Sequence, residues 1–199
     1  MIKRVLRTRK SMLTVSFLGI VFVALAIGSI LAWPVKGRDG RIPRDTVSHV
    51  DVVGENSRFY ALPSLAKDAA RAGDFDEAQR IAEELLALAP GFPHNWNYGN
   101  AIHDANVALG LAAISRGDAN TAKSHLLSAG QAGSSPQLAT FGPNMMLAKA
   151  LLVEGETDAV IEYFELCRSF WEMENGRLDR WSAEVSEGKV PSFGVFLHN

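Results

Sequence analysis

Cysteine is almost absent from this chain of 199 residues, which contains Cys167 alone. One cysteine can form neither an intramolecular disulfide nor a four-cysteine metal cluster, so the redox compartment stays open. The five histidines, at positions 49, 94, 103, 125 and 198, include no pair three or four residues apart, and the sequence predicts no metal site. Cys167 falls between apolar residues of a predicted helix, which indicates a small buried hydrophobe rather than a nucleophile.

Common catalytic signatures are missing as well. The chain has no glycine-rich phosphate loop, no Gly-x-Ser-x-Gly turn and no His-Glu-x-x-His helix. Acidic pairs such as Glu83 with Glu84 fall opposite the apolar stripe of a predicted helix, as is typical of a solvated face. We therefore expect no enzyme and no cofactor.

Positive charge is scarce beyond the first 44 residues. Those 44 residues hold nine Lys and Arg against one acid, whereas residues 45–199 hold 11 Lys and Arg against 21 Asp and Glu. An acidic domain repels phosphate backbones, and no basic stripe with interleaved aromatics is present, so we expect no nucleic-acid partner.

One long uncharged run stands out. Residues Ser11–Trp33 form 23 positions without a charge, enough for a helix to cross the roughly 30 Å hydrocarbon layer of a bilayer. We predict a basic tail over 1–10 and a transmembrane helix over 11–33. A cleaved signal peptide is the alternative, because Ala24-Leu25-Ala26 resembles a cleavage site, although the run is longer than a usual signal core.

The flanking charges give the orientation and the tether. The basic cluster before the run is denser than the one after it, which favours a cytoplasmic N-terminus and an extracytoplasmic, periplasmic domain in a single-pass membrane protein. Residues 34–57 have several glycines and little apolar periodicity, which predicts an extended juxtamembrane linker. Val47–Val53 alternates weakly and could form a short strand, but a lone strand would lack a partner.

Three turn glycines organise the remaining residues, 58–199. Each is followed by an acid, in the pairs Gly73-Asp74, Gly117-Asp118 and Gly155-Glu156. Apolar-periodic stretches precede them at 62–72, 101–116 and 144–154 and follow them at 75–88, 120–129 and 157–171. Glycine ends a helix by taking a left-handed conformation, and an acid suits the N-terminus of the next helix. The pattern predicts three helix hairpins, with a short amphipathic cap at 178–186.

Residues at fixed offsets from these glycines define a packing face. Five and nine positions after each glycine come small or apolar residues, namely Ala78, Ala82, Ala122, Leu126, Val160 and Phe164. Eight and seven positions before each glycine come a large and a small residue, namely Leu65-Ala66, Leu109-Gly110 and Leu147-Ala148. We expect these small residues to let neighbouring helices approach closely.

With this pattern, residues 59–172 resemble the tetratricopeptide repeat family, whose unit is a pair of antiparallel helices. The first repeat fits best, with Gly73-Asp74-Phe75-Asp76-Glu77-Ala78 followed by Leu86-Ala87-Leu88-Ala89-Pro90. The later glycine spacings are 44 and 38 instead of 34, and the terminal proline is displaced or absent. Phe141–Met146 and Phe170-Trp171 also resemble bacterial repeat proteins to which no function is attached. The expected fold is all-α, a short stack of three hairpins with a C-terminal cap.

The resemblance implies a groove formed by the first helix of each hairpin, which would bind a protein or peptide partner. The matching positions are Tyr60, Lys67, Asp104, Leu111, Met145 and Lys149. Asn100, His103 and Asn106 would share one helical side and could hydrogen-bond a peptide backbone. In the alternative interpretation, the asparagines of this region make turns and caps and His103 is a satisfied helix residue.

These patterns lead to the hypothesis of a membrane-anchored scaffold or adaptor. Two alternatives have other structural requirements. A non-enzymatic subunit of an envelope assembly would have apolar residues near Phe193 covered by another chain. An enzyme accessory would hold His103, Asp104 and Asn106 in a closed pocket. The tail that contains Pro191, Phe193 and Phe196 could fold back on the core or remain loose.

Overall fold

The computed structural model of the protein describes residues 44–198, with side chains from Gly54 onward, and this part of the chain consists of helices joined by loops, without strands. The α-helices are α1 Arg44–Ala72, α2 Phe75–Leu88, α3 Tyr98–Ser115, α4 Ala119–Gly130, α5 Pro136–Phe141, α6 Met146–Val153, α7 Thr157–Cys167 and α8 Arg177–Ser186. Two 3₁₀ turns are η1 Ala89–Gly91 and η2 Gly194–Leu197. The prediction of an all-α fold is confirmed for these residues.

The chain divides into two units, 1–48 and 49–199, and the second unit holds the helical domain. Among the described residues no helix combines the length and the apolar character needed to span a bilayer. The predicted basic tail 1–10 and transmembrane helix 11–33 lie outside the described residues.

Helix α1 begins far earlier than the sequence indicates. Residues 44–57, assigned above to an extended linker, are helical, so the linker prediction and the weak strand at 47–53 are both wrong there. The apolar pattern of α1 is confined to its second half, where Phe59, Leu62 and Ala66 are buried. The first half is rich in residues of low helix propensity, including valines and Gly54, which explains why the sequence did not indicate a helix there.

The three predicted helix hairpins are present. Gly73, Gly117 and Gly155 have φ values of +78°, +77° and +85° and end α1, α3 and α6. The acid after each glycine is the residue that begins the next helix. Each second helix starts within one residue of its predicted position, so the turn signals locate the hairpins well.

The acids after the turn glycines act in two ways. The carboxylates of Asp74 and Asp118 accept hydrogen bonds from the backbone N–H groups of Glu77 and Thr121, at 3.2 and 3.0 Å, and so cap α2 and α4. Bonds from the side chain and the backbone N–H of Thr121 hold the pKa of Asp118 below its usual value. Glu156 makes no side-chain cap and instead pairs with Lys123 of α4 at 2.9 Å, which links the second and third hairpins.

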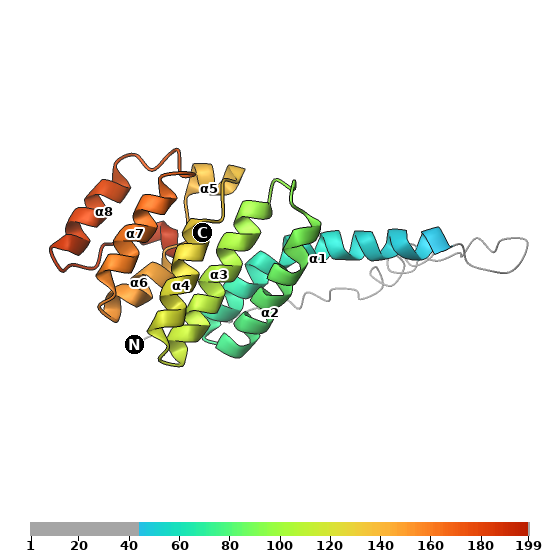
Figure 1. Cartoon of the computed structure of the whole chain (residues 1–199), viewed down its shortest axis with the longest axis horizontal. Helices are drawn as coiled ribbons and strands as arrows, with labels where there is room; N and C mark the ends of the chain where they lie inside the picture. Colours follow the sequence, from blue (N-terminus) through green and yellow to red (C-terminus); the bar gives the residue numbers. More distant parts are fainter. Residues whose placement is uncertain (1–43, 199) are drawn as a thin grey trace, which may run out of the picture. The chain divides into compact units, whose positions relative to one another are not determined.

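The helices pack in chain order, with α3 at the centre (Figure 1). Helix α3 contacts α2, α4, α5 and α6, and nearly all of its residues from Gly99 to Ala113 are buried. Because this helix has neighbours on several sides, its buried residues include polar ones, among them Asn100, His103 and Asp104, as well as apolar ones. Helix α7 packs against α4, α6 and α8, which continues the stack to the last helix.

The predicted packing face is confirmed. All six residues at the offset positions after the turn glycines are fully buried, namely Ala78, Ala82, Ala122, Leu126, Val160 and Phe164. The close approach expected at Gly110 is present, since a Cβ atom there would lie 2.2 Å from a side-chain carbon of Leu147 on α6. Leu65 departs from the pattern: its side chain is exposed, because α1 is the end helix of the described stack.

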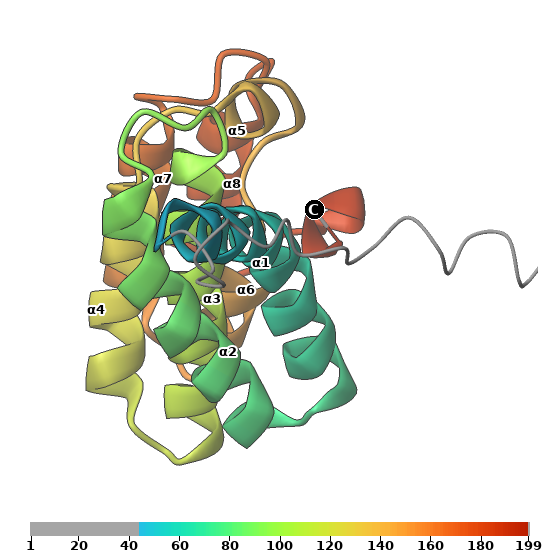
Figure 2. The same ribbon diagram turned by 90° about the vertical axis from the view of Figure 1, so that its right-hand side faces the viewer.

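The tail after α8 folds back on the domain. Phe193 is buried against the rings of Phe164 and Trp181, and Phe196 packs edge-on against Trp171. The backbone N–H of Met145 donates to the carbonyl of Phe196 at 2.7 Å, which places η2 beside α6 (Figure 2). Phe193 is thus covered by its own chain, whereas its neighbours Val190 and Val195 are exposed.

Candidate functional site

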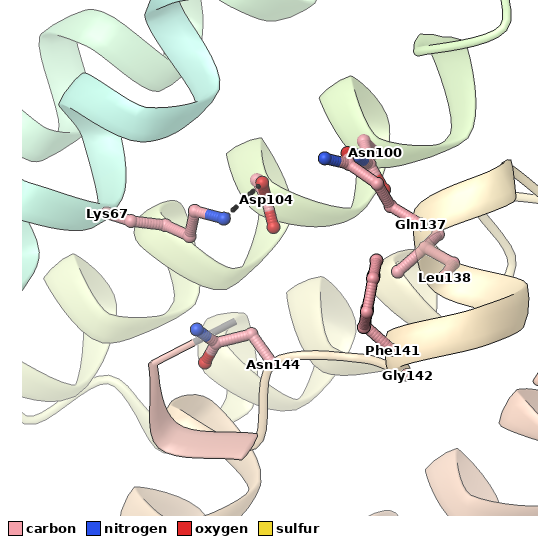
Figure 3. Close-up of a pocket in the computed structure, with 8 residues that line it drawn as sticks. All are labelled: Lys67, Asn100, Asp104, Gln137, Leu138, Phe141, Gly142 and Asn144. Atoms are coloured by element: carbon pink, nitrogen blue, oxygen red, sulfur yellow. Dashed lines mark ion pairs between the residues drawn. The ribbon is translucent and has the colours of Figure 1, made fainter. Parts of the chain in front are cut away.

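Helices α1 and α3 contribute to two hollows, which we call the polar cavity and the apolar groove. The polar cavity has a volume of about 140 Å³ (Figure 3). It is lined by Lys67 of α1, Asn100 and Asp104 of α3, Gln137, Leu138 and Phe141 of α5, and Gly142 and Asn144 of the following loop. Of the predicted site residues, it brings together Lys67, Asn100 and Asp104.

An ion pair forms one wall of the polar cavity. The ammonium group of Lys67 lies 2.9 Å from Oδ2 of Asp104, and the two side chains are only 17% and 7% exposed. A carboxylate this deeply buried is stable only when its charge is paired and its oxygens are hydrogen-bonded. The second oxygen of Asp104 meets this requirement through Nδ1 of His103 at 3.1 Å.

His103 links Asp104 to Tyr163 of the third hairpin. Its Nε2 lies 3.0 Å from the hydroxyl of Tyr163, which is also 3.3 Å from the carbonyl oxygen of Asn144. When the imidazole donates from Nδ1 to Asp104, its Nε2 is an acceptor, so His103 and the carbonyl of Asn144 share the single hydroxyl proton of Tyr163. Complete burial raises the pKa of Tyr163 well above its usual value and keeps this hydroxyl protonated. The chain of contacts therefore ties one residue of each hairpin to the next.

A second set of polar contacts fixes α5 over the cavity. The hydroxyl of Ser135 donates to Oδ1 of Asn100 at 2.8 Å and accepts from the backbone N–H of Leu138 at 3.1 Å. The amide of Asn100 in turn donates to Oδ1 of Asn97 at 3.1 Å. Ser135 thus caps α5 and attaches it to α3, which places Gln137 at the rim of the cavity.

The apolar groove is lined by residues of α1, α3, α6 and the tail, and has a volume of about 480 Å³. It is lined by Ala70, Arg71, Leu111, Met146, Lys149, Ala150, Val153, Leu197 and His198. Leu111 and Lys149 are predicted site residues. The guanidinium of Arg71 donates to the carbonyl of His198 at 2.8 Å, so the folded tail forms one side of the groove. Its lining holds two cations and no carboxylate.

Four predicted site residues lie elsewhere. The side chain of Met145 is fully buried, and its backbone N–H donates to the carbonyl of Phe196 in the tail. His103 is fully buried, and Asn106 bonds His125 of α4 at 3.0 Å, so neither is available to a peptide backbone. Tyr60 stacks on Trp96 at a ring-centroid distance of 5.7 Å, away from both hollows.

The alternative interpretation of the asparagine-rich stretch is the better one. Oδ1 of Asn95 accepts from the backbone N–H of Asn97 at 2.9 Å, a local turn, and His103 is satisfied by its two side-chain contacts. Asn100 is the exception, since it also lines the polar cavity. The enzyme-accessory hypothesis placed His103, Asp104 and Asn106 together in a closed pocket. Of these three residues, Asp104 lines the polar cavity, whereas His103 is fully buried and Asn106 is bonded to His125.

The residues on the α5 side of the cavity were not predicted from the sequence. Ser135, Gln137, Leu138, Phe141 and Gly142 were not among the predicted site residues. A signal for the helix was present, because Ser135 followed by Pro136 is a typical helix start, with a capping side chain and proline in the first turn. The helix has only six residues, too few for a periodic apolar pattern.

The titratable groups of the described residues contain no cluster of three or more His, Cys, Asp and Glu suited to a metal ion. Cys167 is a buried residue of α7 in the third hairpin, and this burial raises the pKa of its thiol. The interpretation of Cys167 as a buried hydrophobe is confirmed by its position. A thiol that is both buried and protonated is a poor nucleophile.

We expect Cys167 to resist labelling by a maleimide in the native full chain and to react fully once the chain is unfolded in guanidinium, because only unfolding exposes the thiol. The number of labels is counted by intact-protein mass spectrometry. The variant Ser186→Cys, which adds a thiol at an exposed position of α8, is the control and should take up one label in the native state. Rapid native labelling of the unaltered chain would contradict the buried placement.

Comparisons with protein family models, with curated proteins and with solved structures found no match to this chain.

Proposed function

We propose that this protein is a membrane-anchored, non-catalytic scaffold whose tetratricopeptide-like hairpins, closed by α8 as a cap, bind a protein partner along the apolar groove. The observation that carries the proposal is the placement of this groove on α1, α3 and α6, the first helices of all three hairpins. In a stack of hairpins this face is the one that extends across every repeat. The N-terminal segment 11–33 would hold the chain in the membrane, with the domain on the extracytoplasmic side.

The groove lining suggests the chemistry of the partner. Its floor is apolar, with Leu111, Met146 and Ala150, and its rim carries the cations Arg71 and Lys149. Val153, also in the lining, is 70% exposed, an unusual state for a valine on a packed helix. Arg71 already pairs with Asp68 at 2.8 Å, which leaves Lys149 as the cation for a partner. A segment with apolar side chains next to an acidic residue would cover this surface and pair with Lys149.

We expect the double variant Lys149→Glu with Val153→Asp to lose the partner in a crosslinking pull-down from membranes that contain the full-length protein. Both residues are exposed, so the domain should remain folded while the net charge of the groove lining changes from positive to negative. Loss of two contacts of this kind corresponds to about 2 to 3 kcal/mol, or roughly a hundredfold in affinity.

Lys189→Glu is the matched control, because Lys189 is exposed, lies beyond α8 and pairs only with the nearby Glu187. It makes the same charge change as Lys149→Glu, but away from the groove, and should leave capture unchanged. If both variants recover the same proteins as the unaltered chain, the groove does not bind the partner. Circular dichroism of each variant excludes loss of the fold as the cause.

A further inference from the structure

The polar cavity contains chemistry that the apolar groove does not use. Its lining carries one cation and one anion, Lys67 and Asp104, and these are bonded to each other. A ligand with a net charge would place an uncompensated charge in a largely buried site, which costs free energy. The charge balance of the cavity therefore favours a neutral polar ligand.

Hydrogen-bonding capacity remains on several lining groups. Lys67 has three N–H donors, of which the ion pair needs one, and the amide of Asn100 gives one of its two protons to Asn97. Gln137 is exposed at the rim and carries both a carbonyl acceptor and an amide donor. A ligand that fits these groups must offer an acceptor and donors close together, as a carboxamide does.

The shape of the cavity limits the size of the ligand. Its volume of about 140 Å³ is close to that of engineered cavities that hold one benzene molecule, so it admits a group of roughly six heavy atoms. Leu138 and Phe141 line one side, and the side chain of Phe141 is 65% exposed in the absence of a ligand. In Figure 3 the ring of Phe141 faces the same space as the polar groups. A short aliphatic stem would pack there.

We propose that the polar cavity binds one neutral carboxamide on a short aliphatic stem, the chemistry of a glutamine or asparagine side chain. Lys67 and Asn100 donate to the carbonyl oxygen of the ligand, Asp104 and Gln137 accept from its amide nitrogen, and Phe141 covers the stem. The corresponding carboxylate is rejected because it would bring a second anion beside Asp104. This site does not depend on occupation of the apolar groove.

The first test is a titration of the ¹⁵N-labelled full chain with the capped residue N-acetylglutamine methylamide, followed by NMR. We expect saturable shifts at Lys67, Asn100 and Gln137, with a dissociation constant in roughly the millimolar range for so small a ligand. The glutamate analogue of the probe should bind at least about tenfold more weakly. Equal binding of the two probes, or no saturable shift at the cavity, would overturn the proposal.

A titration with propionamide distinguishes two possible ligands, a free small amide and an amide side chain within a peptide. If it binds about as tightly as the capped residue, the cavity takes a free small amide. If the capped residue binds about tenfold more tightly, flanking peptide groups contribute and the site takes a side chain within a peptide. Either result supports the carboxamide assignment.

Two glutamine variants provide the matched comparison. Gln137→Ala should weaken binding of the capped probe by about five- to tenfold, the effect of losing one or two neutral hydrogen bonds. Gln131→Ala alters an exposed glutamine outside the cavity and should have no effect. Equal weakening by the two would count against the site. The groove variant Lys149→Glu with Val153→Asp should leave probe binding intact, so this proposal and the proposed function can fail separately.

Discussion

Replacing Gly142 by alanine is expected to lower the free energy of unfolding by roughly 2 to 5 kcal/mol, the combined cost of a left-handed backbone and of overpacking. Gly142 has a φ of +84°, and a Cβ atom there would lie 2.4 Å from Cε2 of Trp171. The indole of Trp171 cannot easily move away, because it also packs against Trp181 and Phe196. Unfolding of the full chain in urea, followed by tryptophan fluorescence, measures the loss.

Gly155→Ala separates the two contributions. Gly155 has a φ of +85°, almost the same as that of Gly142, but a Cβ atom there would have no neighbour within 4 Å. Its variant should lose only the backbone contribution, about 1 to 2 kcal/mol. Because ψ of Gly142 is 173°, its backbone lies in a region almost restricted to glycine, so the difference between the two variants reports the clash with Trp171 together with this extra backbone cost. If both variants lose the same stability, the indole relaxes and the packing of this loop is looser than described.

The contact between Gly142 and Trp171 bears on the candidate site as well as on stability. Gly142 and Asn144 belong to the loop that closes the polar cavity, and Trp171 follows the last helix of the third hairpin. A shift of the indole would move this loop and, with it, the carbonyl of Asn144 that meets Tyr163. We therefore expect Gly142→Ala to weaken carboxamide binding, whereas Gly155→Ala should not.

The hairpins could be predicted from the sequence because their signals are local. A glycine, an acid and a periodic apolar stretch specify where a helix ends, where the next begins and which side it buries, as at Gly73-Asp74 and Gly117-Asp118. Helix α2 was placed at its observed bounds by this reasoning. These signals involve residues within a few positions of one another, so no knowledge of distant contacts is needed.

The missed elements lack such local signals. The first half of α1 has no apolar stripe, and α5 is too short to show one. Helix α5 is held in place by the contact of Ser135 with Asn100, 35 residues away. A contact between residues so far apart depends on how the hairpins stack, and periodicity within either segment does not indicate it.

The residues of the candidate site also divide into those with a local sequence signal and those whose role depends on a distant contact. Lys67 and Asp104 were found because the repeat pattern identifies the first helices, and Asn100 was found from its spacing to His103 and Asn106 on one helical side. The role of His103 was left between two interpretations, since the contact that decides it is with Tyr163, 60 residues away. Histidine on a buried helix is compatible with a ligand-binding or a packing role until its partner is known.

Asp104→Ala is expected to lower the free energy of unfolding by roughly 2 to 4 kcal/mol, because it removes the partner of one charged group and of one buried ring nitrogen. Lys67 is 17% exposed and can recover part of its hydration, so the larger share of the cost falls on His103. The imidazole is fully buried, and its Nδ1 would lose its hydrogen-bond partner. Urea unfolding of the full chain is the measurement here too.

A double-mutant cycle with Lys67→Ala and Asp104→Ala tests whether the pair acts as a unit. Since each variant leaves the other residue without its partner, the double variant should lose less stability than the two single losses together. The exposed pair Glu77 and Arg80 on α2 is the control and should show much weaker coupling, because water solvates both groups. Coupling between Lys67 and Asp104 no stronger than in this surface pair would mean that water also reaches the cavity pair. The charge argument for a neutral ligand would then lose its basis, since a solvated cavity tolerates a charged one.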